Sequence, residues 1–129
     1  MNEPRQAPDS DLLQPQIRAL FAALDHAGEL PGAAAEPGRV LRGEAGREAL
    51  GTRVCFALRL TQGRIVAVRY RAYGCPHTLA ACEWLARRLE AGHEVGNPLQ
   101  WSEHLGLPAA KLGRLLVIED ALRAALEHV

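Results

Sequence analysis

Two runs of alternating apolar and polar residues, separated by a very short connection, constrain the fold more than any other feature of this sequence. In RVCFALRL (53–60) every second residue is large and apolar, and IVAVRYRAY (65–73) follows the same period, with a predicted buried face of Val66, Val68, Tyr70 and Ala72. The connection TQGR is too short for a crossover, so the runs must pair as an antiparallel hairpin. The other face of each run is rich in arginine, which predicts a sheet covered by helices on one side only.

Apolar residues at helical spacing lie on both sides of this hairpin. A first helix is expected from Pro15 to a stop at Gly28, and a weaker third strand in RVLRGEAG (39–46). The period is helical again from Cys75 to Gly92, and a long C-terminal helix is expected from Pro108. This order predicts an α+β fold, in which helices pack on one face of a small antiparallel sheet of about three strands. We expect residues 1–11 to form a flexible segment and residues 12–129 a single domain.

The composition narrows the classes of function. Fifteen basic and fifteen acidic residues give a formal net charge of zero, which argues against a nucleic-acid or anionic-membrane surface as the main function. No apolar run is long enough to span a membrane or to serve as a signal peptide, so we expect a cytoplasmic protein. Three cysteines without a CxxC spacing do not indicate a disulfide framework, and in a reducing compartment they are expected to be free thiols.

The stretch AYGCPHTLAAC (72–82) holds the candidate site. Pro76 suits the first position of a helix, which makes Cys75 the expected N-cap. Partial positive charge at a helix N-terminus favours a thiolate, and such a thiolate could attack an electrophile, accept sulfur or bind a soft metal. The alternative is a cysteine that only caps and packs.

The other cysteines and the histidines have weaker signals for a site with Cys75. Seven helical residues separate Cys82 from it by about 10 Å, too far for a disulfide or a shared metal ion. Cys82 is therefore expected to pack as a small apolar side chain. Cys55 lies on the face opposite Phe56, where it is either packed under another element, which is favoured, or exposed. His77, in the first turn, has the chemistry of a ligand or of an acid/base partner, but a plain surface position is the favoured explanation. His26, like the remaining histidines, is expected at the surface or at a helix cap. A thioredoxin-type site is disfavoured, because a hairpin rather than a βαβ unit precedes the cysteine.

With these elements in place, the sequence resembles the U-type iron–sulfur cluster assembly scaffolds, the family of IscU, SufU and the N-terminal domain of NifU. The similarity covers about residues 16–129. GRIVAVRYRAYGC resembles the strand that leads to the family's second cysteine. LGLPAAKLGRLLVIEDALRAAL resembles the Leu-Pro-Pro-x-Lys segment and the helix that follows it. GEAGREALGTRV and IRALFAALDHAGELPG resemble the first-cysteine segment and the first helix more loosely.

The resemblance assigns roles position by position. Cys75 matches the second of three cluster-binding cysteines, whereas the first and third positions hold Leu50 and Arg114. The family's Asp position holds Thr52, and the His position holds Gly113. The segment that the chaperone recognises in this family is partly kept, in Leu107, Pro108 and Lys111.

The resemblance therefore implies a divergent scaffold or carrier, not an enzyme, that binds iron, a labile cluster or persulfide sulfur through Cys75. His77 and Cys55 are further candidate ligands, the cofactor is a [2Fe–2S] cluster, iron, zinc or none, and one matched cysteine cannot hold a cluster alone. The implied partners are a cysteine desulfurase, an Hsp70-type chaperone system and a second copy of the chain. The alternative function is an interaction or regulatory module that keeps the fold and the docking surface without assembling clusters. A thiol enzyme using Cys75 is a third, minor hypothesis.

Overall fold

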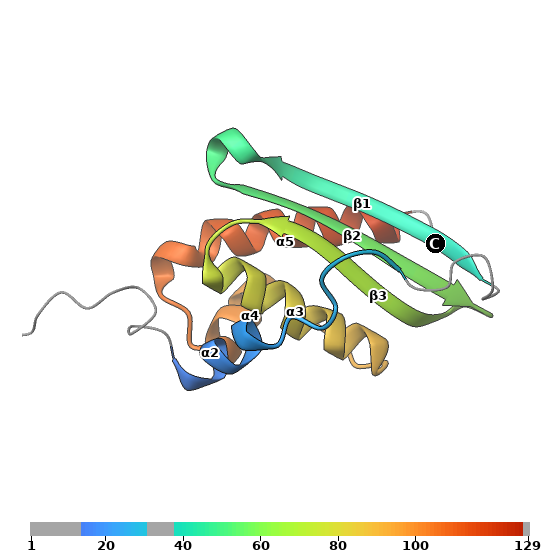
Figure 1. Ribbon diagram of the computed structural model, residues 1–129, viewed down its shortest axis with the longest axis horizontal. Helices are drawn as coiled ribbons and strands as arrows, with labels where there is room; N and C mark the ends of the chain where they lie inside the picture. Colours follow the sequence, from blue (N-terminus) through green and yellow to red (C-terminus); the bar gives the residue numbers. More distant parts are fainter. Residues whose placement is uncertain (1–13, 31–37, 128–129) are drawn as a thin grey trace, which may run out of the picture.

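The computed structural model describes residues 14–30 and 38–127 as helices packed on a small sheet (Figure 1). The expected flexible segment 1–11 and most of the expected loop 31–38 lie outside the described residues. In chain order the elements are α2 (Pro15–Ala22), β1 (Arg39–Arg47), the short 3₁₀ helix η1 (Glu48–Leu50), β2 (Thr52–Thr61), β3 (Arg64–Tyr73), α3 (Pro76–Glu90), α4 (Pro98–Leu105), the 3₁₀ helix η2 (Ala109–Lys111) and α5 (Leu112–Leu126).

The three strands form one antiparallel sheet in the order β1-β2-β3. In the β2–β3 register Val54 lies opposite Ala72, and Phe56 lies opposite Tyr70. Gln62 and Gly63, between these strands, both have positive φ angles, of 55° and 77°. Two such residues in succession form the tight turn whose twist matches a hairpin. The predicted hairpin is thus confirmed, and so is the weaker third strand.

The predicted strand pattern was wrong at Val66, and it was also wrong at Arg59, which lies on the face predicted to be open but is only 1% exposed. A register irregularity lies between Arg59 and Leu60, so that Leu60 pairs with Ile65 and Arg59 with Ala67. This irregularity leaves Val66 without an opposite residue, and its side chain is 49% exposed instead of buried. Bulges of this kind reverse the alternation locally, because the side-chain period of a strand is two.

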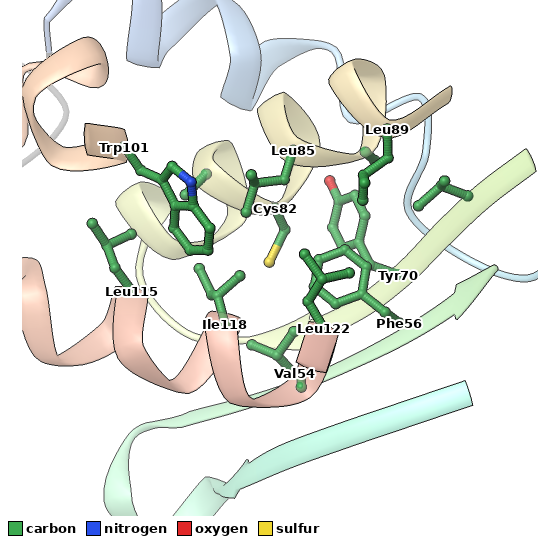
Figure 2. Close-up of a cluster of buried hydrophobic side chains, with 14 of the residues drawn as sticks. Val54, Phe56, Tyr70, Cys82, Leu85, Leu89, Trp101, Leu115, Ile118 and Leu122 are labelled. Carbon is green, nitrogen blue, oxygen red and sulfur yellow. The ribbon is translucent and has the colours of Figure 1, made fainter. Parts of the chain in front are cut away.

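Helices cover one face of the sheet, as predicted. α5 packs beneath β1 and β2, and α3 packs beneath β3. The approach of α5 is closest at Gly43, where an added Cβ would lie 2.2 Å from the amide nitrogen of Ala125. A glycine is therefore needed at this point for α5 to reach the sheet. The core between the layers contains Trp101, Leu115 and Ile118 together with the inward residues of β2 and β3 (Figure 2).

Two helix boundaries differ from the predictions. The first helix ends at Ala22 and not near Gly28, because residues 26–28 instead run beside β3, with a bridge between Ala27 and Tyr70. The long C-terminal helix begins at Leu112, since residues 109–111 form a 3₁₀ turn after Pro108.

Candidate functional site

Cys75 lies at the junction where β3 passes into α3. It is the N-cap of α3 in an extended conformation, with Pro76 as the first helical residue, as predicted. Gly74 precedes it, and an added Cβ at this glycine would lie 2.9 Å from the Cβ of Thr78. The Gly-Cys-Pro sequence therefore allows a sharp strand-to-helix turn that leaves the thiol half-buried in front of the first helical turn.

The surroundings of Cys75 favour its thiolate. Burial raises the pKa of the Cys75 thiol, but hydrogen bonding by Thr78, whose Oγ1 lies 3.5 Å from Sγ, lowers it. The backbone N–H groups of Thr78 and His77 also lower this pKa, although neither forms a full capping hydrogen bond. The positive charge of Lys111, at the end of η2, acts in the same direction. Together these groups leave the pKa of Cys75 below the ordinary value for a thiol.

The positions that the resemblance aligns with the other two cysteines lie at the same end of the molecule (Figure 1). Leu50 belongs to η1, which leads into β2, and the β2 residue Arg53 lies opposite Tyr73 at the end of β3. Arg114 belongs to the first turn of α5, one turn before Val117, which faces Gly46 near the end of β1. The chain thus brings the three aligned positions to one end of the fold.

These residues do not fit a [2Fe–2S] cluster. Such a cluster takes four cysteine ligands or a mixture of cysteine and histidine. The aligned positions offer one thiol, an aliphatic side chain that is 79% exposed at Leu50, and the positive charge of Arg114. Nε of Arg114 is buried, and no hydrogen-bond partner for it is found in the part of the chain that the structure describes. Within residues 14–30 and 38–127, no group of three or more His, Cys, Asp or Glu side chains could hold a metal ion.

The remaining predicted site residues are distributed over different surroundings. His77 is half-buried in the first turn of α3, Thr52 is buried, and Gly113 is exposed. In the predicted docking segment Leu107 is only 9% exposed, whereas Pro108 is exposed and Lys111 is half-buried.

Neither of the other two cysteines joins Cys75. Cys82 is fully buried and its sulfur points into the core toward Ile118 and Leu122 of α5 (Figure 2), where burial raises the pKa of its thiol. Cys55 faces the open side of the sheet, between Glu44 of β1 and Arg71 of β3. It lines a shallow cavity of about 390 Å³ there, and burial together with Glu44 raises the pKa of its thiol.

Sequence reasoning missed a buried polar cluster on the far half of α3. His26 was expected at the surface, but its side chain is only 16% exposed. Its Nδ1 lies 2.6 Å from Oε2 of Glu83, and its Nε2 lies 2.9 Å from Oε1 of Glu90. Glu83 is fully buried and also accepts hydrogen bonds from the Tyr70 hydroxyl and from Nε of Arg87. The spacing of Glu83 and Arg87 was visible in the sequence, but nothing there linked them to a histidine 57 residues away.

Known proteins resemble this chain in sequence and in fold. No family model matches the chain. It is 41% identical over 93 residues to the bifunctional protein NifU/MnmA of Rubrobacter xylanophilus. The matched segment covers 66% of this chain and 19% of that protein. It is also 36% identical over 70 residues to the iron–sulfur cluster assembly scaffold protein IscU of Azotobacter vinelandii, which covers 50% of this chain and 54% of that protein.

A solved structure agrees with these relatives. The putative iron–sulfur cluster assembly scaffold protein for the SUF system from Fervidobacterium islandicum AW-1 superposes with a TM-score of 0.64. The match covers 92% of this chain and 99% of that one, at 13% identity, and therefore concerns the fold. The chain resembles the U-type iron–sulfur cluster assembly scaffolds. The scaffold-like α+β fold expected from the sequence is thereby confirmed.

The extent of the resemblance is partial. The matched region spans about a fifth of the Rubrobacter relative and about half of the Azotobacter relative. Among the described residues, no helix is both long and apolar enough to cross a membrane.

Proposed function

We propose that this protein takes part in iron–sulfur cluster assembly as a carrier that accepts persulfide sulfur on Cys75. The observation that carries the proposal is the single thiol with a lowered pKa at the N-terminus of α3. Support for the process comes from the scaffold protein of Azotobacter, with which the chain shares 36% identity over 70 residues. We place the protein in the cytoplasm, where a free thiol stays reduced.

The chemistry is a thiolate exchange. The Cys75 thiolate attacks the outer sulfur of a persulfide, R–S–SH, carried by a donor protein. A new S–S bond forms on Cys75, the donor's S–S bond breaks, and the donor leaves as the thiolate R–S⁻. The proton stays on the transferred sulfur, so the step consumes no oxidant or reductant. A lowered pKa increases the thiolate fraction near neutral pH, which favours this attack.

Charge explains why sulfur, and not iron, is the better cargo for this site. Lys111 places a positive charge close enough to lower the pKa of Cys75, and Arg114 occupies an aligned ligand position. Positive groups stabilise a thiolate or a persulfide anion, whereas they repel a metal cation. Iron, zinc or a [2Fe–2S] cluster on Cys75 would need further ligands, for which His77 in the same turn is the nearest candidate and Cys55 the less suitable one.

The resemblance supplies the proposed partners. We propose a cysteine desulfurase as the persulfide donor. We further propose that an Hsp70-type chaperone binds the segment that contains Leu107, Pro108 and Lys111. Pro108 is the most exposed of these three residues.

Intact-mass spectrometry after incubation with a persulfide donor tests the function. The wild-type chain should gain the mass of one sulfur atom, and the gain should be reversed by a thiol reductant. Cys75→Ser should show no gain, while Cys82→Ala, a matched control on the same helix, should behave like the wild type. Equal loading of Cys75→Ser would contradict the proposal.

A second function has one observation in its favour. Leu50 and Arg114 remove two of the aligned ligands while the fold is kept, as expected of an interaction module that no longer handles sulfur or metal. Two results together would establish this alternative: no sulfur on Cys75 from a competent donor, and stable binding of the same desulfurase.

A further inference from the structure

The two edge strands of the sheet differ in how the hydrogen-bonding groups of their outer backbone are paired. The outer edge of β3 is partly covered by the segment after α2, since the amide of Gly28 donates to the Tyr70 carbonyl at 2.8 Å and the amide of Tyr70 donates to the His26 carbonyl at 3.0 Å. β1 is the opposite edge, and among residues 14–30 and 38–127 only β2 pairs with it. An edge strand of nine residues is a template for another strand.

We propose that β1 pairs antiparallel with β1 of a second copy, around a two-fold axis at Gly43. This inference goes beyond the sulfur-carrier function and does not depend on it. In this register Arg42 of each copy lies opposite Glu44 of the other, on the open face of the sheet. Opposite charges directly across an antiparallel pair stabilise it, and two-fold symmetry provides the interaction twice.

Both side chains can make the new contact. Arg42 is exposed, and within the described part of the chain no ion pair of Arg42 is found. Glu44 uses one carboxylate oxygen, Oε2, to accept from Arg53 at 2.8 Å and 3.2 Å. Its other oxygen, Oε1, has only the weak contact from the Cys55 thiol at 3.6 Å. One carboxylate oxygen is therefore available to a guanidinium from the second copy.

The charge pattern also selects this register. Moving the axis by one residue, to position 42 or 44, would place Arg42 opposite Arg42 or Glu44 opposite Glu44, both of which are destabilising. At Gly43 no side chain stands on the axis. This register also places Arg39 of one copy opposite Arg47 of the other at each end of the interface, and these like charges reduce its stability.

The proposed dimer has a consequence for the thiol. β1 ends at Arg47 beside η1, on the same end of the molecule as Cys75 (Figure 1). Antiparallel pairing places the two Cys75 residues at opposite ends of the shared sheet. This dimer therefore keeps two separate thiols and does not form a cluster bridged between the two copies.

Sedimentation equilibrium of the full chain tests the interface. The wild-type chain should dimerise, and Arg42→Glu should raise the dimer dissociation constant by about tenfold or more, since it places like charges opposite each other twice. The double charge exchange, Arg42→Glu with Glu44→Arg, should recover most of the loss. Arg18→Glu, an equal change of charge on exposed α2, should leave the constant unchanged.

Hydrogen exchange gives an independent reading at the same edge. Amides of residues 40–46 should gain protection as the protein concentration rises through the dissociation constant. A chain that stays monomeric at high concentration, a dimer insensitive to Arg42→Glu, or a double exchange that binds no better than Arg42→Glu would each overturn the proposal.

Discussion

The start of α3 and its far half differ in how their polar groups are used: the start presents a thiol, and the far half buries a hydrogen-bonded carboxylate. At its start the N-cap residue Cys75 is half-buried, and its Sγ lies 3.5 Å from Oγ1 of Thr78. Two turns later Glu83 is fully buried, and its carboxylate accepts from His26, Tyr70 and Arg87. The helix start leaves backbone N–H groups unsatisfied and so can stabilise an added negative charge. In the far half the carboxylates of Glu83 and Glu90 are hydrogen-bonded and anchor the helix. One helix thus contributes both a reactive thiol and much of the stability.

The sharpest contrast lies between two thiols on this helix. Alkylation by iodoacetamide under native conditions should modify Cys75 at least about a thousandfold faster than Cys82, which reacts only through opening of the core. The Cys82 thiol is buried and its pKa is raised, whereas that of Cys75 is lowered. Peptide mapping over time measures both rates in one sample. Similar rates for the two residues would remove the contrast.

The anchoring half should dominate stability. Glu83→Ala leaves His26, Tyr70 and Arg87 without their shared acceptor and should lower the free energy of unfolding by about 3–5 kcal/mol. Glu119→Ala is the matched control, because Glu119 also pairs with an arginine four residues later, Arg123, but near the surface. That change should cost less than about 1 kcal/mol. Urea denaturation measures both, and equal losses would contradict the anchoring role.

The same cluster predicts a loss of stability in acid. Burial raises the pKa of Glu90, but hydrogen bonds and charges from Val68, His26 and Arg69 lower it by more than burial raises it. The pKa of Glu90 in the folded state is therefore below the ordinary value. A lowered carboxyl pKa contributes stability that is present above the unfolded pKa, about 4.3, and is lost as the pH falls through the folded pKa. The free energy of unfolding should therefore fall below about pH 4, and less steeply in Glu90→Gln. Identical pH profiles for the two proteins would exclude this contribution.

The smallest effect concerns the charge near the thiol. Lys111→Ala should raise the pKa of Cys75 only slightly, because solvent screens the charge of a half-buried pair, and Lys111→Arg should largely preserve it. The pH dependence of the alkylation rate gives the pKa directly. A lower pKa in Lys111→Ala would show that the sign of this interaction is wrong.

The sequence was informative where local chemistry decides the structure. Strand alternation and the TQGR connection determine the hairpin, and Pro76 determines the start of α3 and thus the position of Cys75. Long-range pairing was not visible. His26 contacts Glu83 across 57 residues, and the bulge that exposes Val66 depends on how two strands align. The predicted docking residue Leu107 is mostly buried, because α4 ends at Leu105 and the turn that follows packs it against the core.

The sequence predicted where the candidate site lies, but it did not predict all of the groups that set the pKa of its thiol. The resemblance aligned Leu50, Cys75 and Arg114 with the three cysteines of one site, and the fold places all three at one end of the molecule. The contribution of Lys111 to the pKa of Cys75 depends on how η2 lies against the start of α3, which no local pattern encodes.

The central claim is that Cys75 alone among the three thiols accepts sulfur. The most direct test is fragment mass spectrometry of the wild-type chain after brief exposure to a substoichiometric persulfide donor. The account predicts the added sulfur on the peptide that contains Cys75, with Cys55 and Cys82 unmodified. Added sulfur on Cys55, or an even distribution between Cys55 and Cys75, would contradict it.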